Sequence, residues 1–79
     1  SNNIQETIDK EYKMHQLDFF LGKLNERERF IIERTYGIGC MAESFGTIAL
    51  RLDLGKERVR QICVAAVKKM QKYKEMVEK

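Results

Sequence analysis

Apolar side chains recur at every third or fourth position along most of this 79-residue chain, which is the spacing of amphipathic helices. Proline is absent, and no strong run alternates between apolar and polar residues in the manner of a half-buried strand. We therefore expect an all-α domain without a sheet. The first helix is predicted over about residues 4–23, where the repeat is formed by Ile4, Ile8, Met14, Leu17, Phe20, Leu21 and Leu24.

Residues that favour helix ends delimit a second helix. Asn25 and Glu28 have the spacing of a capping box, in which the side chain of each residue accepts from the backbone N–H of the other. Gly37 can adopt the left-handed conformation that commonly follows a helix. These signals predict a helix over residues 26–36.

Two more helices follow a short loop. Ser44 is a favourable N-cap for a third helix over residues 45–52. After a tight turn, Gly55 can cap a fourth helix that is predicted over about residues 56–76. The expected architecture is thus a small four-helix domain.

The last two predicted helices have the dimensions of a helix-turn-helix. That motif needs a short helix, a turn of three or four residues and a second helix that enters the major groove of DNA. Ala49 is small, as the close approach of two helices requires. We expect a helix-turn-helix of the winged-helix-like DNA-binding class, without a sheet, whose helices meet through Ile48, Ala49, Leu52, Leu54, Val59 and Ile62.

The fourth predicted helix has two chemically different faces. At about 100° per residue, one arc is apolar and contains Val59, Ile62, Cys63, Ala66, Met70 and Tyr73. The opposite arc contains Lys56, Glu57, Arg60, Gln61, Val64 and Lys68. Such a helix can anchor a domain and also present side chains to base edges, because Arg pairs with guanine, Gln with adenine and Glu with cytosine N4. An ordinary amphipathic surface helix would show the same division.

Charge is distributed unevenly along the chain. Residues 1–55 carry seven basic and nine acidic side chains, a formal charge of −2, whereas residues 56–79 carry eight basic and three acidic, a charge of +5. The basic second part suits contact with a polyanion. A solvated basic helix would carry the same charges.

Several classes of function are disfavoured. A chain of this size makes one domain and leaves little room for an enclosed active site beside its core. We expect no enzymatic activity, because no nucleophile–base pair or phosphate-cradling glycine loop is present. Cys40 and Cys63 lack the spacing of a zinc site, so we expect no metal and no cofactor. Two free thiols, no signal peptide and no membrane span favour a cytoplasmic protein.

The beginning of the chain suggests processing. Ser1 and Asn2 look like the remnant of a cleaved tag, so we expect residues 1–3 to be a disordered start and residues 4–79 to form a single domain.

Two segments resemble region four of bacterial sigma factors, the C-terminal promoter-recognition domain. From Leu24 to Ile38 the chain reads LNERERFIIERTYGI, which is similar to the opening of that region. From Leu52 to Ile62 it reads LDLGKERVRQI, which is similar to its recognition-helix signature, and AVKKM ending at Met70 continues the match. The resemblance covers about residues 20–71. It implies a primary-type sigma factor, and the loop after Tyr36 is similar to that of primary sigma factors from the Bacteroidetes.

The resemblance implies roles for individual residues in binding the −35 promoter element. The residues expected to read bases are Lys56, Glu57, Arg60 and Gln61. The residues expected to contact the DNA backbone are Arg27, Ser44, Arg58 and Lys68.

The resemblance also implies protein partners. The family docks on the flap-tip helix of the RNA polymerase β subunit through apolar surface of its first two helices. Candidates for this contact are Phe20, Leu21, Ile32 and Tyr36. We expect the strip around Phe20, Leu21 and Tyr36 to be partly exposed, whereas Ile32 is explained best as plain core. An anti-sigma factor or a transcription activator is a further possible partner of such a domain.

This chain departs from the family pattern at several positions. Thr35 stands where the family usually has arginine, and Cys63 where it has glutamate. Lys56 replaces an arginine, which exchanges a bidentate fork for a point charge. Gly55 replaces a threonine or serine cap, and Gly46 and Thr47 stand at acidic positions. These departures affect the target sequence rather than the fold.

Two other interpretations fit the same pattern. A helix-turn-helix regulator would bind its operator as a dimer, with the first helix supplying a self-complementary apolar surface. A protein-interaction module would be a docking target without reading DNA itself. A lone sigma domain should be monomeric, so sedimentation separates the first alternative from it.

Overall fold

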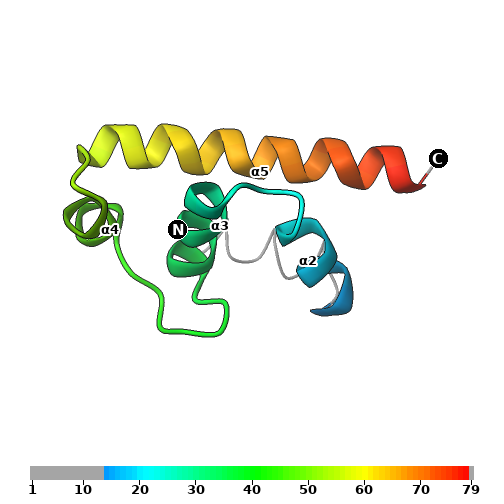
Figure 1. Cartoon of the computed structure of the whole chain (residues 1–79), viewed down its shortest axis with the longest axis horizontal. Helices are drawn as coiled ribbons and strands as arrows, with labels where there is room; N and C mark the ends of the chain where they lie inside the picture. Colours follow the sequence, from blue (N-terminus) through cyan, green and yellow to red (C-terminus); the bar gives the residue numbers. More distant parts are fainter. Residues whose placement is uncertain (1–13, 79) are drawn as a thin grey trace.

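The computed structural model describes residues 14–78, which form four helices and no strand. The helices are α2 (Met14–Leu21), α3 (Glu26–Tyr36), α4 (Phe45–Leu52) and α5 (Lys56–Glu78) (Figure 1). The predicted all-α fold class is confirmed in this part of the chain. The predicted bounds of the second and third helices are correct, and the fourth helix continues two residues beyond the predicted end.

The first predicted helix ends earlier than expected. The N–H groups of Lys23 and Leu24 bond to the carbonyls three residues before them, at 3.0 and 3.1 Å, so the chain tightens after Leu21. This turn brings Leu24 into the core, where it is buried. The N-terminal part of the first predicted helix, residues 4–13, lies outside the described residues. The predicted tag remnant at residues 1–3 lies outside them as well.

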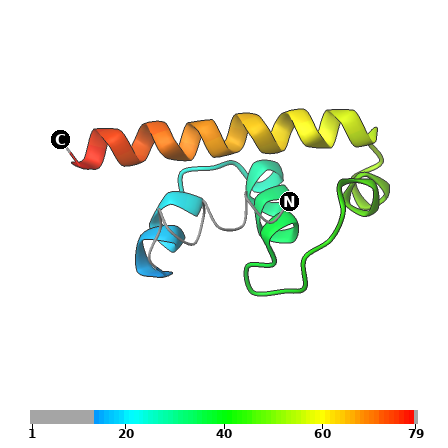
Figure 2. The ribbon, with the colours of Figure 1, turned by 180° about the vertical axis from the view of Figure 1, so that it is seen from behind.

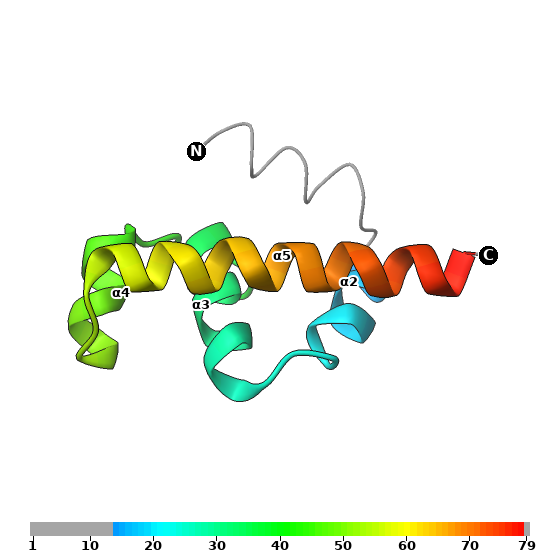
Figure 3. The same cartoon turned by 90° about the horizontal axis from the view of Figure 1, so that it is seen from above.

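The long helix α5 organises the domain. It contacts α2, α3 and α4, and α3 also contacts α4. The three shorter helices follow one another beneath α5, with α4 near its beginning and α2 near its end (Figure 1). The view from behind shows the same order (Figure 2). From above, α5 lies across the other three helices (Figure 3).

The core lies between α5 and the shorter helices. It is apolar, and no charged side chain of the described residues is buried. The predicted apolar arc of α5 faces it, with Tyr73 partly buried. The buried residues are Phe20, Leu21, Leu24, Ile31, Ile32, Tyr36, Ile48, Ala49, Val59, Ile62, Cys63, Ala66 and Met70.

Both predicted ends of α3 are confirmed. The Asn25 side chain accepts from the Glu28 N–H at 2.8 Å, and the Glu28 carboxylate accepts from the Asn25 N–H at 3.0 Å. Glu28 also accepts from Lys69 of α5 at 3.2 Å, so the same carboxylate joins two helices. Gly37 has φ +70°, and a Cβ there would lie 3.1 Å from both Ala42 N and Cys40 O. Glycine is therefore required by both conformation and space.

One carboxylate holds the loop between α3 and α4. The Glu43 N–H donates to the Arg34 carbonyl at 2.8 Å. Its carboxylate lies 2.8 Å from Arg51 Nε on α4 and 3.6 Å from an Arg34 nitrogen on α3. The Glu43 side chain is only 14 % exposed, so these contacts are better shielded than ordinary surface ion pairs. The arrangement fixes where α4 begins.

The core assignment predicts a large difference between two residues of α4. Ile48 is fully buried, whereas Leu50 is 85 % exposed. Ile48→Ala should lower the free energy of unfolding by about 2 to 5 kcal/mol, because it leaves a cavity between α4 and its neighbours. Leu50→Ala should change it by about 0.5 kcal/mol or less. Urea denaturation followed by circular dichroism measures both, and equal midpoints for the two variants would contradict this packing.

Candidate nucleic-acid interface

A three-residue turn sets the angle between α4 and α5. Asp53 ends α4 in the left-handed conformation, with φ 56° and ψ 45°. Asp tolerates this region better than most residues do. The chain then folds back, so that the Leu54 N–H donates to the Ala49 carbonyl at 2.9 Å. The Gly55 carbonyl accepts from the Val59 N–H at 3.1 Å, which places Gly55 at the predicted cap of α5.

The predicted contact set of the motif is confirmed. Ile48 and Ala49 of α4 and Val59 and Ile62 of α5 are buried. Leu52 and Leu54 are partly buried and pack against the same core. Because these side chains fill the angle between the two helices, the opposite face of α5 is turned outward.

The four predicted base-reading side chains all lie on that outward face. Lys56, Glu57, Arg60 and Gln61 are exposed and occupy the first two turns of α5. We define these four residues as the reading face. The structure thus brings them together on one accessible surface at the beginning of a helix, as a helix-turn-helix requires.

Two members of the reading face bind each other. Arg60 Nε lies 2.9 Å from each carboxylate oxygen of Glu57. The hydrogen bonds from Arg60, assisted by its positive charge, hold the pKa of Glu57 below its ordinary value. The spacing of three residues on a helix permits such a pair. From the sequence, each of the two side chains was expected to contact a base separately.

The predicted backbone-contact residues are also accessible. Arg27, Arg58 and Lys68 are exposed on α3 and α5. Ser44 is confirmed as the N-cap of α4, because its hydroxyl oxygen accepts from the Thr47 N–H at 3.2 Å. The Thr47 hydroxyl lies 3.0 Å from the same oxygen. The Ser44 hydroxyl therefore already has partners within the domain.

The predicted exposure of the polymerase-binding candidates is wrong. Phe20, Leu21, Ile32 and Tyr36 are between 0 and 4 % exposed and belong to the core. They are covered because α5 continues far enough to lie over both α2 and α3. The expectation of plain core for Ile32 agrees with its burial.

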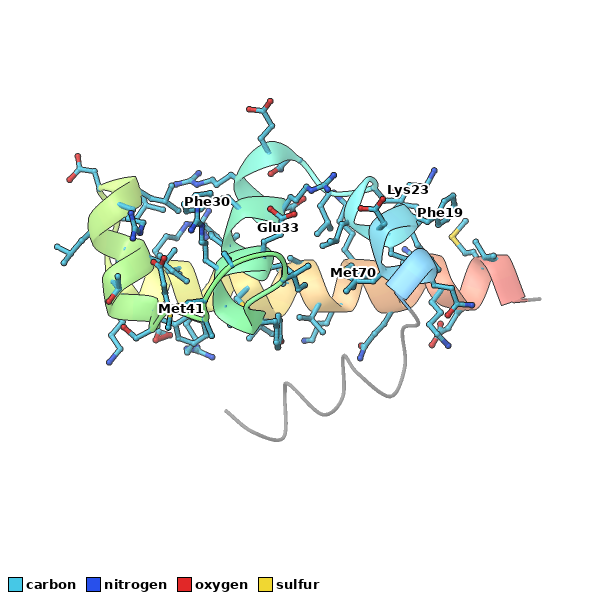
Figure 4. The ribbon with its side chains drawn as sticks, turned by 90° about the horizontal axis from the view of Figure 1, so that it is seen from below. Phe19, Lys23, Phe30, Glu33, Met41 and Met70 are labelled. Carbon is cyan, nitrogen blue, oxygen red and sulfur yellow. The ribbon has the colours of Figure 1, made fainter. Side chains whose placement is uncertain are left out.

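An apolar side chain on α2 is exposed instead. Phe19 is 51 % exposed, and its ring packs edge-on against that of Phe20, with centroids 5.2 Å apart. The Lys23 ammonium lies 4.9 Å from the centre of the Phe19 ring (Figure 4). The sequence signal for this surface was the pair of adjacent phenylalanines, because neighbours on a helix point about 100° apart and only one of them can face the core squarely.

Two departures from the family pattern are neighbours inside the domain. Burial raises the pKa of the Cys63 thiol, and the side chains of Thr35 and Tyr36 lie beside it. Burial also raises the pKa of Tyr36 far above its ordinary value. All of these groups are therefore neutral at pH 7. The buried Cys63 is not positioned for chemistry with DNA.

Other site chemistries find no support in the described residues. Among residues 14–78, no cluster of His, Cys, Asp and Glu is arranged to hold a metal ion. None of the helices described is both long and apolar enough to span a membrane.

This geometry defines the chain as a helix-turn-helix domain of the DNA-binding class. The chain belongs to the Sigma-70, region 4 family, whose model matches residues 20–72.

The chain is also similar to one part of a longer sigma factor. Over 67 residues it is 36 % identical to the RNA polymerase sigma factor sigD, chloroplastic, of Arabidopsis thaliana. The aligned part is 84 % of this chain but only 16 % of that relative, so the similarity concerns one domain of a larger protein. No solved structure matches the chain significantly.

The pair on the reading face predicts a measurable titration. In Arg60→Ala the pKa of Glu57 should rise towards its ordinary value of 4.5, because the hydrogen bonds that favour the carboxylate are lost. In the unsubstituted chain, the contribution of the pair to folding stability is present near neutral pH. It is lost as the pH falls through the lowered pKa of Glu57. Titration of the side-chain carboxyl by NMR measures the change. Lys68→Ala is the control and should leave the pKa of Glu57 unchanged. If Arg60→Ala also leaves the pKa of Glu57 unchanged, the pair does not form in solution.

Proposed function

We propose that this chain is the promoter-binding domain of a sigma factor, which reads the −35 element through α5 and docks on RNA polymerase. The observation that carries the proposal is the reading face, a set of polar side chains exposed together at the start of a helix whose other side is the core. Membership of the Sigma-70, region 4 family supports it. We further propose that the intact protein is a primary-type bacterial sigma factor that acts in the cytoplasm.

Each side chain of the reading face suits a different base edge. Arg60 can donate to guanine O6 and N7, and Gln61 can pair with adenine. Lys56 supplies a positive point charge beside them. These groups lie in the first two turns, the part of a recognition helix that enters the groove most deeply.

Glu57 has a role in orienting Arg60. Its carboxylate accepts from Nε and from one terminal nitrogen of the guanidinium, which leaves the other terminal nitrogen free. A restrained arginine loses less conformational entropy on binding a base than a free one. Glu57 can also accept from cytosine N4, because its carboxylate has more acceptor sites than Arg60 occupies.

The flanking cations position the helix on the DNA. Arg27 on α3, and Arg58 and Lys68 on α5, are exposed and can pair with phosphates. Ser44 contributes through its place at the start of α4, where backbone N–H groups point outward. These contacts hold the duplex in register without selecting its sequence.

The surface that we propose for the β-flap of RNA polymerase is centred on Phe19. This ring is exposed on α2, beside the buried Phe20 that anchors it. An apolar ring with a cation at its edge suits an amphipathic partner helix. We expect the isolated domain to be a monomer that binds DNA weakly, because attachment to the polymerase supplies the effective concentration at the promoter.

The proposed function predicts two kinds of DNA-binding defect. The probe is a duplex that the unsubstituted chain selects from a randomised pool. Arg60→Ala or Gln61→Ala should weaken binding to it by about 1 to 3 kcal/mol and relax discrimination at particular base pairs. Lys68→Ala should weaken selected and scrambled duplexes alike and reduce the slope of log affinity against log salt by about one. Fluorescence anisotropy at several salt concentrations separates the two effects, and a uniform loss from all three variants would show that α5 is only a phosphate clamp.

The docking surface predicts a separate defect. Phe19→Ala should reduce binding to a purified β-flap fragment, because it removes the exposed ring, and should leave DNA binding unchanged. Leu50→Ala removes another exposed apolar side chain, 85 % exposed on α4, and is the control. Calorimetric titration of the flap fragment measures both variants. Equal flap affinities for Phe19→Ala and the unsubstituted chain would place the contact elsewhere.

A further inference from the structure

An aliphatic side chain lies in the middle of the polar arc of α5. Val64 is 40 % exposed, and it is the large exposed apolar side chain in the first half of this helix. At about 100° per residue, Val64 projects between Arg60 and Gln61 when the helix is viewed down its axis. It is therefore flanked on both sides by residues of the reading face.

The core does not explain Val64. The apolar residues of α5 that are buried are Val59, Ile62, Cys63, Ala66 and Met70, and those packed against the core from the same helix are Val67 and Tyr73. Val64 belongs to neither group. Valine is also a weaker helix former than alanine because of its branched Cβ, so neither packing nor helix propensity favours it here.

The chemistry of the major groove supplies a partner. The edges of the base pairs there carry hydrogen-bond donors and acceptors, and the C5-methyl group of thymine is the apolar group among them. We propose that Val64 is a specificity-determining residue that contacts a thymine methyl group beside the base pair read by Gln61. This inference rests on the proposed function, in which the reading face enters the major groove.

The helix geometry places Val64 within reach. It lies about 4.5 Å along α5 from Gln61, at about 1.5 Å per residue. One base-pair step is about 3.4 Å, so the contact falls about one step from the pair that Gln61 reads. Helical side chains lean towards the helix N-terminus. The methyl groups of Val64 therefore lean towards the turn that carries Arg60 and Gln61, which is the deeper part of the groove.

The pairing of Arg60 with Glu57 keeps this position open. Glu57 lies one turn before Arg60, and its carboxylate engages the Arg60 guanidinium at 2.9 Å. The arginine side chain is thus drawn away from Val64. An aliphatic group that faces the groove between a restrained arginine and a glutamine suits a methyl contact better than a further hydrogen bond.

The test removes the apolar group from either partner of the proposed contact, the methyl groups of Val64 or the C5-methyl of thymine. The full 79-residue chain is titrated with the duplex that it selects from a randomised pool, and each thymine is replaced in turn by deoxyuridine. That replacement deletes the C5-methyl and leaves the O4 acceptor in place. For the unsubstituted chain, one replacement should weaken binding about fourfold, the equivalent of about 0.8 kcal/mol for one buried methyl group. In Val64→Ala, the same replacement should have no further effect, which is the non-additivity of two groups in contact.

A second valine of the same helix is the matched control. Val77 is 61 % exposed near the end of α5, far from the reading face, and Val77→Ala should retain the full deoxyuridine effect. The inference is overturned if Val64→Ala keeps that effect, or if no thymine methyl matters to the unsubstituted chain. If Arg60→Ala and Gln61→Ala relax discrimination but Val64→Ala keeps the deoxyuridine effect, the proposed contact of Val64 is wrong and the proposed function still holds. Because the isolated domain is expected to bind weakly, selection and titration are done at low salt, where phosphate contacts strengthen binding. If the pool yields no preferred sequence even there, the proposed function itself fails, and the methyl contact with it.

Discussion

The burial of one face of α5 is the constraint on which the rest of the structure depends. This helix contacts all three other described helices, and its apolar arc supplies a large part of the core. A rotation of α5 about its axis would expose Val59 and Met70 and carry Arg60 into the core. Burying a valine or methionine side chain is worth about 1.5 to 3 kcal/mol, so that rotation is strongly opposed. The orientation of the reading face is thus determined by packing on the opposite side of the same helix.

The sequence was sufficient for those features that depend on local signals. The capping box at Asn25, the left-handed Gly37 and the N-cap at Ser44 lie where they were predicted, because each depends on residues within one helical turn. Helical periodicity also identified the buried face of α5. The expectation that the strip around Phe20, Leu21 and Tyr36 is partly exposed came from the resemblance and is wrong, because α5 lies over these residues and periodicity does not reveal what covers an apolar face. The Glu43 carboxylate joins α3 and α4 through Arg34 and Arg51. No local sequence pattern predicts such a contact across a loop.

Two departures from the family pattern have one physical explanation. Thr35 stands where the resemblance implies an arginine, and Cys63 where it implies a glutamate. In the structure these side chains are neighbours between α3 and α5, and Cys63 is buried. A single charge left there would lack a partner in a low-dielectric site, at a cost of several kcal/mol. The neutral side chains that stand here carry no such cost.

The position of the short helices along α5 separates the surfaces of the domain. The reading face and Val64 belong to the first three turns of α5, and Phe19 belongs to α2. The helix α4 lies beneath the beginning of α5, whereas α2 lies nearer its end (Figure 1). The helix has 23 residues, which makes it about 35 Å long. In the proposed function, a partner bound at Phe19 on α2 leaves the reading face accessible, so the domain can be held through α2 while the beginning of α5 contacts DNA.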